Sequence, residues 1–207
     1  MLKELFESAF YLTHPRKAGT LLMLHETLHH GSFSMCDPLA CADCEHCRTN
    51  PGERKNIKVH SSSDVHVLGL SQVFALMTSD SDKNCDYLIE SCGVPCLLEM
   101  TCSRQQYVEK SKRSHAMSQL YSTLCVLFEV PDIRAHMERA PKRYAVFSWK
   151  NKDLLEDDAD VVERGFLPFT RFADETYSID NEQNFDFGFR FKEVRYPDTL
   201  DFDALML

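Results

Sequence analysis

Four cysteines lie close together near the start of the chain, at a spacing that suits a metal ion. Cys36, Cys41, Cys44 and Cys47 follow the pattern C-x4-C-x2-C-x2-C. Thiolates two residues apart can reach one tetrahedral Zn²⁺ at about 2.3 Å. Such an ion would stabilise a loop that has no core of its own, because its binding energy becomes folding energy. We therefore predict a structural zinc site here; a disordered cysteine-rich loop and a disulfide formed on oxidation stay open as alternatives.

A second candidate lies just before this cluster. His25, Glu26 and His29 form an HExxH pattern, which we expect on a helix that follows a leucine-rich run. Histidines at i and i+4 share one helix face and can bind Zn²⁺, and the glutamate can activate a water as a general base. The pattern resembles that of zinc metallopeptidases, which implies a zinc-dependent hydrolase with Glu26 as its catalytic residue. Met35 stands where that family has its third ligand, so this is the alternative function, and a structural helix explains the same residues.

Composition excludes several other classes. Hydrophobic residues make up 43% of the 207 residues and charged residues 27%, which is typical of a globular protein. Seven glycines leave little material for a glycine-rich phosphate loop. No apolar run approaches the ~20 residues of a membrane span, so we expect no membrane partner. Without a secretory signal, nine cysteines favour an intracellular protein, nuclear or cytoplasmic, with reduced thiols. Five of them we expect as small buried core residues, namely Cys85, Cys92, Cys96, Cys102 and Cys125.

The formal net charge of −9 is placed unevenly. Residues 151–207 hold 15 of the 32 acidic residues but only 6 of the 23 Lys and Arg residues. Phosphates would be repelled by this segment, which argues against nucleic acid as its partner. A solvated tail or a basic protein partner fits better.

Apolar spacing predicts several helices. Leu2, Leu5, Phe6, Ala9 and Phe10 recur at helical spacing, and His14-Pro15 ends that helix. A long helix is expected over 65–77, a short one ending at Gly93, and a third from Pro95 through Met100. A further helical stripe comprises Met117, Leu120, Tyr121, Leu124, Leu127 and Phe128, followed by a last turn at 133–137.

These segments resemble armadillo and HEAT repeats. Gly93-Val94-Pro95 followed by a leucine-rich helix matches the family's turn, and Leu70-Ser71-Gln72-Val73 matches its third-helix core. Met117-Ser118-Gln119-Leu120 repeats that core 47 residues later, within the roughly 40–47 residue period of the family. The resemblance implies a mainly α armadillo-like solenoid over 1–140, of about two to three repeats, with the cysteine-rich insertion at 31–58.

The third helices of armadillo proteins carry an asparagine that often contacts extended peptides. Here Gln72 and Gln119 stand at that position, so the resemblance makes them candidate protein-binding residues. Simple solvent exposure of both glutamines is the alternative.

The last part of the chain, 141–207, has a pattern that indicates strands rather than helices. Residues 143–149 alternate loosely, and Phe185, Phe187, Phe189 and Phe191 alternate with polar residues or glycine, which predicts two strands. We expect them to pair as a small β element that packs on the last helices, followed by an acidic-apolar tail at 200–207. Together these features predict a protein–protein interaction scaffold rather than an enzyme.

Overall fold

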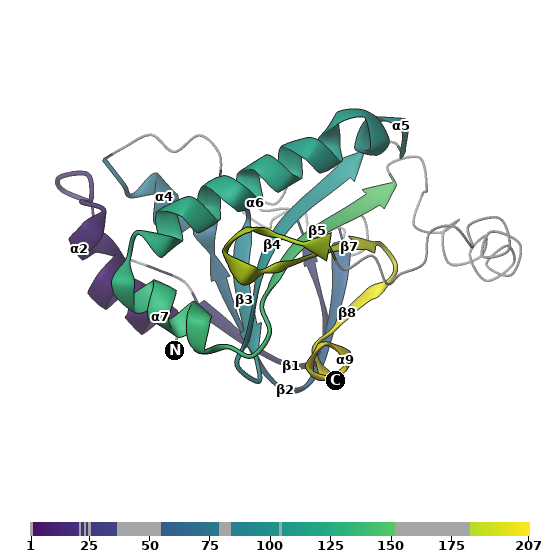
Figure 1. The fold of residues 1–207 in the computed structure, drawn as a ribbon, viewed down its shortest axis with the longest axis horizontal. Helices are drawn as coiled ribbons and strands as arrows, with labels where there is room; N and C mark the ends of the chain where they lie inside the picture. Colours follow the sequence, from purple (N-terminus) through teal and green to yellow (C-terminus); the bar gives the residue numbers. More distant parts are fainter. Residues whose placement is uncertain are drawn as a thin grey trace, which may run out of the picture.

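The protein is built on a large mixed β-sheet, not on stacked helices. The computed structural model describes residues 2–20, 22, 24, 26–36, 55–78, 84–103, 105–151 and 183–207. These residues contain an eight-stranded sheet with helices packed against it (Figure 1). The expected mainly α, armadillo-like solenoid is therefore wrong, and its repeats do not exist as structural units.

The N-terminal helix is confirmed. It consists of three consecutive segments, α1 (Leu2–Leu5), the π-helix η1 (Phe6–Phe10) and α2 (Tyr11–Thr13). Leu2, Phe6, Ala9 and Phe10 are buried, as their spacing predicts. The helix ends at His14, because the residue before a proline is disfavoured in helical conformation.

Two long strands and a hairpin follow. Strands β1 (Glu26–Cys36) and β2 (Lys55–Gly69) are antiparallel, and the short helix α4 (Leu70–Ala75) leads from β2 toward the next strand. Strands β3 (Tyr87–Ser91) and β4 (Val94–Ser103) form a tight hairpin. The helix expected at the HExxH residues is thus wrong for Glu26 and His29, which lie on β1, and the helix expected at 95–100 is wrong because these residues lie within β4.

The second half of the chain forms helices after β4 and then adds further strands to the same sheet. Its elements are α5 (Gln105–Tyr107), η2 (Val108–Lys112), α6 (Arg113–Phe128), α7 (Pro131–Arg139), β5 (Tyr144–Asn151), β6 (Gln183–Asn184), η3 (Asp186–Gly188), β7 (Arg190–Arg195), β8 (Thr199–Asp201) and α9 (Phe202–Met206). The helices at 116–128 and 133–137 and the strand at 143–149 are confirmed. Of the strand expected over 185–191, only Arg190 and Phe191 lie in a strand, at the start of β7.

The strand order is β1-β2-β3-β4-β5-β7-β6, with β8 pairing separately with β2. Strands β4, β5 and β7 are parallel, and β8 is parallel to β2. The strands come from both sides of residue 140. In Figure 1 the N-terminal helices lie at the left, while β8 and α9 lie beside β1 and β2 at the lower right.

Two cores lie on the two faces of the sheet. We call the first the helix-side core, in which N-terminal, α4, α6 and α7 side chains pack on Leu88, Leu97, Ala145, Phe147 and Trp149. The second, the strand-side core, gathers residues of β1–β5, β7, β8 and α9: Met35, Ile57, Val59, Val65, Val67, Ile89, Val94, Cys96, Leu98, Met100, Tyr144, Val146, Val194, Leu200, Phe202 and Leu205. The acidic-apolar tail therefore folds back on its own sheet.

Two features explain why β3 and β4 look helical in sequence. Cys92 (φ 53°) and Gly93 (φ 72°) form the turn between them with both residues left-handed, the geometry of a tight hairpin rather than of a helix end. Strand β4 is central, so Leu97 faces one core and Leu98 the other. A strand buried on both faces reads as a continuous apolar run, which lacks the period-two signal.

Candidate functional site

An open groove lies between the end of α6, helix α7 and the turn η3. It has a volume of about 530 Å³ and is lined by Cys125, Phe128, Glu129, Arg134, Glu138, Arg143 and Phe187. This volume falls within the ~300–1,000 Å³ typical of ligand sites. The groove is therefore the candidate binding site of the described structure.

Aromatic rings form the apolar part of the groove. The rings of Phe128 and Phe187, which both line the groove, lie 4.6 Å apart, and the ring of Tyr121 lies beside the lining, 6.2 Å from that of Phe187. Tyr121 and Phe187 remain 45% and 37% exposed, large values for aromatic side chains. Interaction with the Cys125 side chain raises the pKa of the Tyr121 hydroxyl, a group that can both donate and accept hydrogen bonds.

Phe187 has an unusual backbone conformation. Its φ is +58°, in the left-handed region, which costs an L-residue about 1–2 kcal/mol. The following Gly188 is also left-handed, and a Cβ there would collide with Nη2 of Arg143. Arg143 links this turn to α7, since its Nε donates to the Gly188 carbonyl and its Nη1 donates to the Met137 carbonyl. The turn thus holds the Phe187 ring at the groove.

Charged side chains surround the aromatic part. Arg134 Nε donates to Glu138 Oε1 at 2.9 Å, one turn along α7. Glu129 lies 3.8 Å from the imidazole of His14. With two arginines and two glutamates, the lining carries both signs. An aromatic centre with a charged rim is the composition common in protein–protein interfaces.

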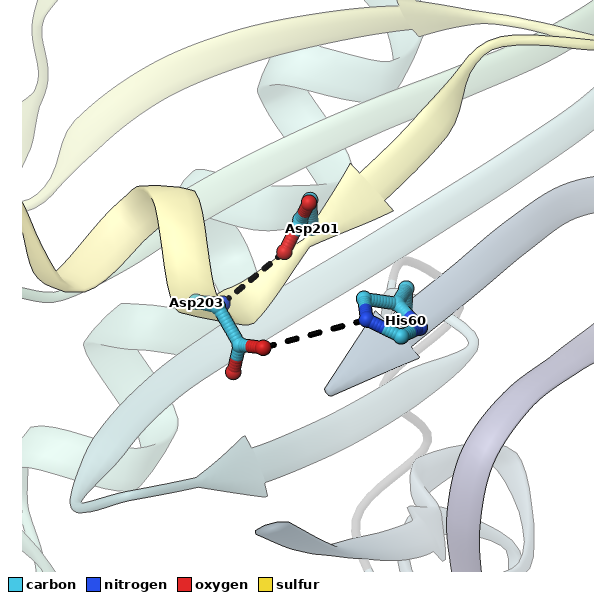
Figure 2. Close-up of side chains that lie close together, drawn as sticks. All are labelled: His60, Asp201 and Asp203. Atoms are coloured by element: carbon cyan, nitrogen blue, oxygen red, sulfur yellow. Dashed lines mark hydrogen bonds and ion pairs between the residues drawn. The ribbon is translucent and has the colours of Figure 1, made fainter. Parts of the chain in front are cut away.

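A second group of polar side chains lies where the C-terminal segment meets strand β2. Among the side chains that the structure describes, His60, Asp201 and Asp203 are the one group of three that could hold a metal ion, with donor atoms within 4.8 Å of one another. Figure 2 shows His60 on β2 facing Asp203 at the start of α9. Their sequence signal is weak, because His60 is one of nine histidines and meets Asp203 only through the pairing of β8 with β2.

A buried polar cluster lies under α6. The backbone amide of Cys85 donates to Thr123 Oγ1, and that of Met100 donates to Asp86 Oδ2, both at 2.8 Å. Burial, reinforced by the carboxylates of Glu99 and Asp86, raises the pKa of the Cys85 thiol. A thiol held protonated is a poor nucleophile.

The two HExxH residues that the structure describes, Glu26 and His29, do not belong to a group that could hold a metal ion. His25 lies outside the described residues, and Glu26 and His29 lie on β1, not on a helix. Glu26 Oε1 lies 2.6 Å from His66 Nδ1, and its Oε2 accepts from the Lys3 amide. His29 instead stacks on Phe33, with ring centroids 4.1 Å apart. The helical geometry on which the peptidase alternative depends is absent at these two residues.

Of the predicted zinc ligands, only Cys36 is described, at the end of β1. Cys41, Cys44 and Cys47 lie outside the described residues, so the zinc site stays a prediction. The expected burial of the other cysteines is correct for Cys85 and Cys96 but wrong for two: Cys92 and Cys102 are exposed, and Cys125 is half-buried in the groove lining.

The two glutamines lie apart from any repeat surface. Gln72 is exposed on α4, and Gln119 on α6 donates from Nε2 to the Asn84 carbonyl at 3.1 Å. They do not form the line that stacked third helices would present. Their role in protein binding stays a prediction.

Comparisons with known proteins show no family. No family model, no curated protein and no solved structure matches this chain. None of the described helices is long and apolar enough to cross a membrane.

Proposed function

We propose that this protein is a binding module that recognises an aromatic or large apolar side chain of a partner protein in the groove between α6, α7 and η3. The observation that carries the proposal is Phe187, a partly exposed ring held at the groove by a strained backbone. Residues with a strained backbone persist only where the surrounding structure holds them, and they cluster at functional sites. Here Gly188 permits the turn, and the hydrogen bond from Arg143 to the Gly188 carbonyl holds it.

The chemistry of the groove supports a protein partner. Aromatic residues and arginine are enriched at interfaces and dominate hot spots. Tyr121 adds a neutral hydroxyl beside the apolar rings, and Arg134 and Glu138 offer charges of both signs at the rim. A partner segment with one ring or branched aliphatic side chain as its anchor would displace water from Phe128 and Phe187.

Selection from a displayed peptide library tests the proposal. We expect the wild-type protein to enrich peptides that share an aromatic or large apolar anchor. Phe187→Asn removes the ring but tolerates the left-handed backbone, and Tyr121→Ala removes the second exposed ring from a helix. Each substitution should weaken binding of the selected peptides at least about tenfold, the size of a moderate hot spot.

Leu12→Ser is the matched control, because Leu12 is 84% exposed on α2 and does not line the groove. This variant should bind the peptides as the wild type does. Peptides that bind all four proteins equally, or a library from which nothing is enriched, would contradict the proposal.

A further inference from the structure

Three potential metal ligands lie close together where the C-terminal segment runs beside β2. His60 lies on β2, Asp201 is the last residue of β8, and Asp203 is in the first turn of α9. The parallel pairing of β8 with β2 places His60 opposite Asp201. His60 and Asp203 are 40% and 38% exposed, so an ion can reach them from solvent.

Both carboxylates are held by hydrogen bonds to other groups (Figure 2). Asp201 Oδ1 caps α9 by accepting from the amides of Asp203 and Ala204, at 2.9 and 3.3 Å. Both oxygens of Asp203 accept from Ser62: Oδ1 from its amide and its hydroxyl, both at 3.0 Å, and Oδ2 from the same amide at 3.1 Å. Metal ligands in proteins are commonly oriented by such outer hydrogen bonds, which reduce the cost of ordering them when the ion binds.

The imidazole is oriented in the same way. Nδ1 of His60 lies 2.8 Å from the hydroxyl of Ser32 on β1, which leaves Nε2 facing Asp203. Nε2 lies 3.8 Å from Asp203 Oδ2, too far for a direct hydrogen bond. Two donors bound to one ion at about 2.0–2.2 Å lie roughly 3.0–3.5 Å apart. The gap between imidazole and carboxylate therefore fits a bridging cation after a shift of a few tenths of an ångström.

We propose that His60, Asp201 and Asp203 bind one divalent transition-metal ion, such as Mn²⁺ or Zn²⁺, that fastens the C-terminal segment to β2. One imidazole and two carboxylates form a donor set that suits these ions, and water would complete their coordination. The ion would join β2 to α9, whose Phe202 and Leu205 belong to the strand-side core. This site shares no residue with the predicted cysteine cluster or with the lining of the aromatic groove.

Electron paramagnetic resonance titration of the reduced 207-residue protein with Mn²⁺ tests the site. Mn²⁺ is the suitable probe because thiolates of the cysteine cluster favour softer ions. We expect the wild type to bind one Mn²⁺ per chain. Asp201→Asn keeps an oxygen to cap α9 but loses the charge, and His60→Gln loses the imidazole. Each should weaken Mn²⁺ binding at least about tenfold.

His30→Gln is the control, because His30 pairs with Asp64 at 3.1 Å on the same β1–β2 hairpin but lies outside the group. It should bind Mn²⁺ as the wild type does. Mn²⁺ should also raise the melting temperature of the wild type and His30→Gln, but not of Asp201→Asn. No Mn²⁺ uptake at millimolar concentration, or equal uptake by all four proteins, would overturn the proposal.

Discussion

Tyr11 joins two helical segments through one hydrogen bond, and the contribution of its hydroxyl to stability depends on pH. Its hydroxyl, on α2, donates to the carbonyl of Val73 on α4 at 3.1 Å. Burial raises the pKa of Tyr11 to about 12, an effect that the nearby Arg16 guanidinium partly offsets. The protonated hydroxyl is thus favoured in the folded state. The stability that it contributes is present below the unfolded pKa near 10 and is lost as pH rises toward 12.

Replacing Tyr11 by Phe should therefore have an effect that disappears at high pH. At pH 7 we expect the free energy of unfolding to fall by about 1 kcal/mol, the net contribution of one hydrogen bond. Between pH 10 and pH 12 the difference between wild type and Tyr11→Phe should shrink, because only the wild type loses this contribution. Urea unfolding at pH 7, 9 and 11 measures it. A difference that is constant across these pH values would contradict the assignment.

The C-terminal segment β8–α9 should be an integral part of the fold. Phe202 is fully buried in the strand-side core, whereas Leu207, five residues later, is fully exposed. Phe202→Ala should lower the free energy of unfolding by about 3 kcal/mol, through lost burial and the cavity left behind. Leu207→Ala, which removes a side chain of similar apolar character, should change it by less than about 0.5 kcal/mol. Equal urea midpoints for the two variants would show that this segment is not packed.

Helix α6, which buries one face, was predictable from sequence, whereas strand β4, which is buried on both faces, was not. Helix α6 carries Leu120, Leu124 and Leu127 toward the helix-side core, so its 3.6-residue period is visible. Strand β4 buries residues on both faces and has no such period. Gly93 as a helix end and Pro95 as a helix start then suggested a helix, but these residues instead form strand β4 and its hairpin turn, paired with β3 and β5.

The sites depend on contacts between distant parts of the sequence, which single-sequence patterns do not contain. The aromatic alternation that includes Phe187 predicted a strand, but the left-handed turn that presents its ring depends on Arg143, 44 positions earlier. Similarly, the spacing of Asp201 and Asp203 suggested only an acidic-apolar tail. Their approach to His60 requires the parallel pairing of β8 with β2.

At the scale of the whole molecule, the sheet makes the two halves of the chain depend on each other. Strand β5 lies between β4 and β7, and it contributes Ala145 and Phe147 to the helix-side core and Tyr144 and Val146 to the strand-side core. Strand β8 then pairs with β2, near the other end of the sheet. A segment that ends at residue 140 would contain α6 and α7 but would expose the edge of β4 and one side of each core.

The segment 1–140 should therefore not fold alone, although its helices resemble a separate domain in sequence. Each core would lose several buried apolar side chains, worth about 1.5–3 kcal/mol apiece, against a total stability of about 5–15 kcal/mol for a typical domain. We expect this fragment to lack a cooperative urea transition by far-UV circular dichroism, while the 207-residue protein unfolds in one. Cooperative unfolding of the fragment would show that α6 and α7 form an independent helical domain. The same outcome would mean that β5, β7 and β8 add to a sheet that is already stable without them.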